Sequence, residues 1–135
     1  MSTVSSAVRW LSILLSLVAL HSAVVGLVLI VAPPSMMEAF GYAAIAEPFF
    51  KTQGGVFHIV MAVAYALAAL DPKGRRTMVA FTIAAKMIAT VFLVVYYAVV
   101  SAIPVILASA AGDFLMGVLL LLLFRTVTRR SPSPG

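Results

Sequence analysis

Four ionisable side chains lie deep inside stretches of this chain that are otherwise almost wholly apolar. They are His21, His58, Lys86 and Asp113, one in each of four apolar runs. A carboxylate near the middle of a membrane-spanning helix costs about 2.5–3.5 kcal/mol on insertion scales, so it needs a partner inside the protein. Because Lys86 and Asp113 carry opposite charges, the sequence predicts a buried ion pair between them.

Four apolar runs position these residues, and each run is long enough to cross a bilayer as a helix. We expect helices over residues 10–31, 48–70, 77–100 and 102–124. Hydrophobic residues make up 64% of the 135 residues and charged residues 10%, a balance typical of an integral membrane protein with one domain. The predicted fold is an all-α, up-down antiparallel four-helix bundle.

The ionisable residues are expected at a similar depth and mostly on inward faces. With a rise of about 1.5 Å per residue, all four lie within about one helical turn of a common level. The helical period places Tyr97 on the face of Lys86 and Tyr65 on the face of His58. The interior is therefore predicted to hold a buried polar layer, in which the histidine and both tyrosines hydrogen-bond around the ion pair. Its members are His58, Tyr65, Lys86, Tyr97 and Asp113.

His21 differs from the other three because it lies on the face of its helix opposite the small residues. We expect it to contact lipid, a partner protein or a bound cofactor. His21 and His58 lie at matching depth on successive helices, which is the minimum for ligating a haem with two histidines. The mismatch of their faces makes a haem or pigment site the weaker alternative. A second open alternative concerns the ion pair, which could lock the helices together and take part in no chemistry.

The distribution of basic residues predicts the orientation of the chain. Apart from Lys51 and Lys86, they all fall on one side of a four-span arrangement; these are Arg9, Lys73, Arg75, Arg76, Arg125, Arg129 and Arg130. Since cytoplasmic loops carry the excess of lysine and arginine, both termini are expected in the cytoplasm. The predicted location is the cell membrane, which is the inner membrane in a bacterium with two membranes.

Two segments outside the spans have their own predictions. Residues 35–41 are expected to form a short helix at the membrane surface, with an irregular loop as the alternative. The S-x-x-E pattern of Ser35 and Glu38 predicts a capping box with Ser35 as the N-cap, and Gly41 fits the position after the helix end. The proline- and serine-rich tail, residues 131–135, is predicted to be disordered.

The sequence contains no motif for catalysis or for metal binding. It has no cysteine, no H-E-x-x-H, no glycine-rich phosphate loop and no nucleophile–base pattern, so no catalytic residue and no metal ligand is assigned. The net charge of +5 arises mainly at helix ends and does not indicate nucleic acid. The favoured function is a non-catalytic membrane protein, either a subunit of a larger membrane complex or a binder of a small apolar ligand. The alternatives are a redox or quinone-handling subunit and a proton-coupled small transporter.

Several landmarks together resemble a known family. They are the A-P-P end of the first run, the Glu47–Lys51 entry into a helix with Gly54-Gly55, Tyr65, the basic turn, Lys86, Pro104, and Gly112-Asp113 followed by Gly117. In these features the chain resembles the DoxX-like group of small bacterial four-helix membrane proteins, some of which have no assigned function. The resemblance implies a four-helix fold. It also implies a link to quinone or sulfur redox complexes, in which some relatives are membrane subunits.

Overall fold

The computed structural model describes residues 2–43 and 47–129, and within these ranges it is helical with no strand. This confirms the all-α prediction. The predicted disordered tail, residues 131–135, lies outside the described residues. Five helices follow one another along the chain: α1 (Ser2–Val31), α2 (Pro34–Ala39), α3 (Phe49–Leu70), α4 (Arg76–Val99) and α5 (Pro104–Arg129).

Four of these helices are long and apolar enough to cross a membrane, namely α1, α3, α4 and α5. Their length and composition indicate a multi-pass protein in a lipid bilayer. Two of them extend beyond the apolar runs, because α1 begins at Ser2 and α5 continues to Arg129. Hydropathy locates the part of a helix that lies in lipid. Arginine is a good helix former, so the helix can continue past that part.

The short helix α2 begins differently from the prediction. Pro33 is its N-cap and Pro34 its first residue, and no side chain caps it, so the predicted capping box at Ser35 is wrong. The fixed φ of proline fits the first helical position, which moves the start of the helix ahead of Ser35. The end agrees with the prediction. Gly41 follows the C-cap Phe40 with φ +92°, a left-handed conformation that glycine adopts without a steric cost.

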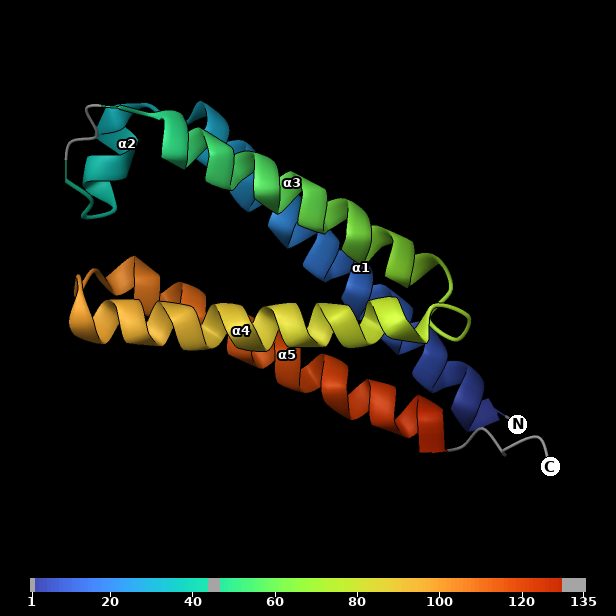
Figure 1. Ribbon diagram of the computed structural model, residues 1–135. Helices are drawn as coiled ribbons and strands as arrows, with labels where there is room; N and C mark the ends of the chain where they lie inside the picture. The colour runs from blue at the N-terminus through green and yellow to red at the C-terminus, as the bar shows by residue number, and fades with distance from the viewer. Residues whose placement is uncertain (1, 44–46, 130–135) are drawn as a thin grey trace.

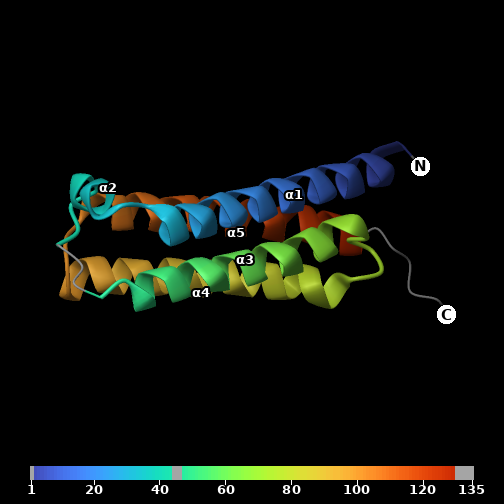
Figure 2. The same cartoon turned by 90° about the horizontal axis from the view of Figure 1, so that it is seen from above.

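The four long helices form two closely packed pairs. Helix α1 packs against α3 and α4 packs against α5, while α1 also contacts α5 and α3 contacts α4 (Figures 1 and 2). Figure 1 shows that successive long helices run in opposite directions, which brings the two termini to one end of the molecule. Within the first pair, Ser12 Oγ donates a hydrogen bond of 2.6 Å to the carbonyl of Ala69.

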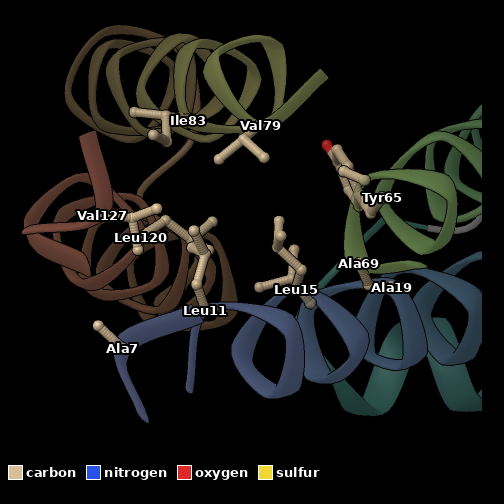
Figure 3. Close-up of a cluster of buried hydrophobic side chains, with 12 residues drawn as sticks. Ala7, Leu11, Leu15, Ala19, Tyr65, Ala69, Val79, Ile83, Leu120 and Val127 are labelled. Atoms are coloured by element: carbon tan, nitrogen blue, oxygen red, sulfur yellow. The ribbon is translucent and has the colours of Figure 1, made fainter. Parts of the chain in front are cut away.

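The apolar core is concentrated at the end that carries the termini (Figure 3). The buried cluster takes its members from the first part of α1, the last part of α3, the first part of α4 and the last part of α5. It consists of Ala7, Leu11, Leu15, Val18, Ala19, Tyr65, Ala68, Ala69, Val79, Ile83, Leu120 and Val127. We call it the core cluster. His58, Lys86 and Asp113, in the middle of their helices, lie outside the core cluster. Tyr65 is the one member of the predicted polar layer that belongs to it.

Candidate functional site

The structure brings Lys86 and Asp113 together across the α4–α5 contact. Lys86 Nζ lies 2.6 Å from Asp113 Oδ1, and the two side chains are 5% and 13% exposed. An aspartate side chain is short, so the pair requires the two helices to approach closely. Gly117, one turn after Asp113, makes this possible, since a Cβ there would lie 3.4 Å from Lys86 Cβ and 2.9 Å from Met87 Sδ.

Tyr65 reaches the same ammonium group with its ring. Lys86 Nζ lies 5.7 Å from the ring centroid, within the range of a cation–π contact. The prediction had Tyr65 as a hydrogen-bonding neighbour of the pair, and the structure replaces that bond with the contact to the ring face. Tyr65 is buried and belongs to the core cluster, so it joins the apolar end of the protein to the polar layer.

His58 on α3 pairs with a residue of α1 that the sequence prediction did not include. Ser22 Oγ lies 3.3 Å from His58 Nδ1, and it donates a 3.1 Å hydrogen bond to the His58 carbonyl. Ser22 is almost fully buried. Its spacing from Ala19 and Gly26, three and four residues away, places it on the small-residue face of its helix, which is the signal that could have identified it.

Two of the predicted residues lie apart from this group. His21 is exposed on the surface of α1, next in sequence to the buried Ser22. Tyr97 is half-buried near the end of α4, and no hydrogen bond joins it to the ion pair among the described residues. Tyr97 follows Lys86 by eleven residues on one helix, which separates them by about 16 Å along the axis. In the part of the chain that it describes, the structure therefore shows no contact of Tyr97 with the ion pair.

A cavity of about 190 Å³ lies against the polar layer, and we call it the central cavity. All four long helices contribute to its wall, through Ser22, Phe57, His58, Met61, Tyr65, Ala85, Lys86, Ala89 and Asp113. Ala85 and Ala89 are four residues apart on α4, and their small side chains leave the space open beside Lys86. His21 does not line this cavity. The cavity thus combines an apolar wall with one ion pair and one imidazole.

The arrangement contains no group of three or more histidine, cysteine, aspartate or glutamate side chains able to hold a metal ion, within the residues that the structure describes. Two polar contacts within the protein make up the site: Lys86 with Asp113, and His58 with Ser22. Comparison of the chain with protein-family models, curated proteins and solved structures gives no match.

Proposed function

We propose that this chain is a non-catalytic integral membrane protein whose central cavity binds a small, mainly apolar molecule. It would act alone or as a subunit of a larger membrane complex. The supporting observation is the cavity, which has a volume of about 190 Å³ and is lined by all four long helices. Engineered apolar cavities of about 150 Å³ hold a benzene molecule, so this volume is enough for a ring-sized group.

The position of the ion pair in the cavity wall favours binding over a purely structural role. A pair that only held α4 against α5 could be sealed completely between them. Asp113 instead keeps 13% of its side chain exposed and lines the cavity together with His58. Charged residues in membrane spans commonly mark the site of a substrate or ion. The pair can therefore fix the orientation of a bound molecule by its polar end.

The proposed setting is the cell membrane, the inner one in a bacterium with two membranes. The four spans would form an up-down bundle with both termini in the cytoplasm. Arg9, Lys73 and Arg125 belong to the excess of basic residues at the end with the termini, which supports this orientation. Kinship with the DoxX-like group is part of the same proposal and rests on the sequence landmarks alone.

A matched pair of alanine substitutions tests the binding function. Ala89→Leu adds bulk to the wall of the central cavity and leaves its polar residues unchanged, whereas Ala84→Leu adds the same side chain at an exposed position of α4. Native mass spectrometry of the proteins purified in mild detergent should show a small molecule on the wild type and on Ala84→Leu. Ala89→Leu should lose it. Wild-type protein that carries neither a small molecule nor a partner subunit would contradict the proposal.

A proton-coupled transporter is the second candidate, favoured by one observation. Asp113 and His58, two groups able to exchange protons, line the same cavity, and the carboxylate is partly exposed there. If transport is the function, Asp113→Asn should abolish ion-coupled uptake in proteoliposomes and leave the yield of folded protein intact. Uptake that survives this substitution would remove the candidate.

A further inference from the structure

The contacts of Ser22 favour one of the two neutral tautomers of His58. A serine hydroxyl has one proton to donate, and a carbonyl oxygen can only accept. The hydrogen bond that Ser22 Oγ donates to the His58 carbonyl, 3.1 Å away, uses the one hydroxyl proton. With that proton used, the 3.3 Å contact between Ser22 Oγ and His58 Nδ1 is a hydrogen bond in the tautomer whose Nδ1 carries the imidazole proton and donates it. His58 Nε2 is left as a hydrogen-bond acceptor.

In this tautomer, His58 Nε2 and the Asp113 carboxylate are both acceptors in the wall of the central cavity. His58 lines the cavity, and its hydrogen bonds among the described residues involve Nδ1 and the carbonyl oxygen, so Nε2 has no partner among them. Within the described part of the chain, no fully buried side-chain nitrogen or oxygen lacks a partner. Nε2 is thus not sealed away from a ligand. Asp113 contributes carboxylate oxygens and is more exposed than Lys86, whose ammonium already donates to Asp113 Oδ1. A ligand that supplies a donor can satisfy His58 Nε2, which no ligand able only to accept can do.

We infer that the ligand of the central cavity carries a hydroxyl group, as an alcohol or a phenol on an apolar body, and donates it to His58 Nε2. This inference rests on the proposed binding function and names the chemical class of its ligand. Ser22 is a positioning residue, since it holds the imidazole in the accepting tautomer. The apolar walls formed by Phe57, Met61 and Ala89 contact the rest of the molecule.

The chain allows a direct test because it has only two histidines. His21→Gln leaves His58 as the one histidine and changes an exposed residue outside the cavity. Nitrogen NMR of this variant, labelled with ¹⁵N-histidine, should show a protonated Nδ1 and an unprotonated Nε2. Adding 4-fluorophenol should shift the Nε2 resonance, while 4-fluoroanisole, whose oxygen has no proton, should leave it in place. Ser22→Ala in the same background should produce a mixture of tautomers.

The outcomes separate this inference from the binding function. A protonated Nε2 in the ligand-free protein, or equal shifts with the phenol and the anisole, would overturn the hydroxyl assignment while the cavity remains a binding site. No response to either probe, with the same ¹⁹F spectra for the wild type and Ala89→Leu, would show a cavity that takes no ring-sized ligand. That result would contradict both proposals.

Discussion

Lys86 is the residue on which the polar interactions of the interior converge. It donates to Asp113, contacts the ring of Tyr65 and is buried. Replacing a buried pair with apolar groups is often tolerated, whereas removing one member leaves a charge without compensation. Removing one partner should therefore destabilise the protein more than removing both.

We predict that Lys86→Met lowers the yield and the melting temperature of the protein more than the double change Lys86→Met/Asp113→Leu. The single change leaves the carboxylate of Asp113 alone in the membrane, at a cost of about 2.5–3.5 kcal/mol. The double change removes that cost. Yield of monodisperse protein and thermal unfolding in detergent provide the measurement. Equal losses from the single and double variants would show that the two residues do not stabilise one another.

Helical periodicity predicts some contacts of these residues and misses others. The pairing of Lys86 with Asp113 follows from opposite charges at similar depth, which the sequence contains. Helical periodicity also predicts Tyr97 beside the pair, because it gives the direction of a side chain and leaves out its position along the helix axis. Ser22 was missed for a different reason. A serine carries no charge, and its importance comes from the partner that α3 brings to it.

At the scale of the elements, two glycines set the distance between α1 and α3. A Cβ on Gly55 would lie 2.6 Å from the carbonyl oxygen of Gly26 and 2.7 Å from Ile30 Cγ1, while a Cβ on Gly26 would lie 2.7 Å from the carbonyl oxygen of Gly55. Backbone atoms cannot move aside as a flexible side chain can. Small residues of this kind let membrane helices approach closely. The contact holds Ser22 within reach of His58.

We predict that Gly55→Ala lowers the melting temperature and that Gly54→Ala does not. Overpacking of a close contact costs about 1–3 kcal/mol, and Gly55 has no free space for a methyl group. A Cβ on the neighbouring Gly54 meets nothing within 4 Å, so this control should gain the better helix propensity of alanine, at most about 1 kcal/mol. Thermal unfolding of both variants in one detergent gives the comparison. Similar melting temperatures would contradict the assigned role of the glycine contact.

The start of α3 is also tied to the end of α1. Lys51 Nζ donates a 2.7 Å hydrogen bond to the carbonyl of Ala32, just beyond the last residue of α1. The carbonyls at a helix end have no partner within the helix, and a cation there complements the helix dipole. This contact could not be predicted from the sequence, because Lys51 and Ala32 are nineteen residues apart and meet only when α3 packs against α1.

We predict that Lys51→Met destabilises the protein by about 1.5–3 kcal/mol, the typical value of a hydrogen bond to a charged group. Gln53→Met is the matched control, since Gln53 is exposed and two residues away on the same helix. Thermal unfolding should separate the two variants. If Gln53→Met has an equal effect, the loss comes from adding methionine near the membrane surface, and the bond to Ala32 contributes little.

At the scale of the whole molecule, the protein has a packed end and an open middle. The core cluster fills the end with the termini, and Tyr65 forms the boundary between it and the central cavity. The four apolar helices could be predicted from the sequence, because every backbone group in lipid needs a partner within its own helix. The central cavity could not be predicted in this way. Its volume depends on how the α1–α3 and α4–α5 pairs pack against each other, which no single helix determines.

The orientation of the whole molecule in the membrane is simple to test, because the sequence contains no cysteine. Glu38 lies on α2 and Lys73 in the turn between α3 and α4, both are exposed, and they belong to opposite ends of the molecule (Figure 1). Basic residues gather at the end of Lys73, which should face the cytoplasm. A membrane-impermeant maleimide should therefore label Glu38→Cys in spheroplasts and label Lys73→Cys only after the membrane is broken. Labelling of Lys73→Cys in intact spheroplasts would reverse the orientation, and equal labelling of both would indicate that the chain inserts in two directions.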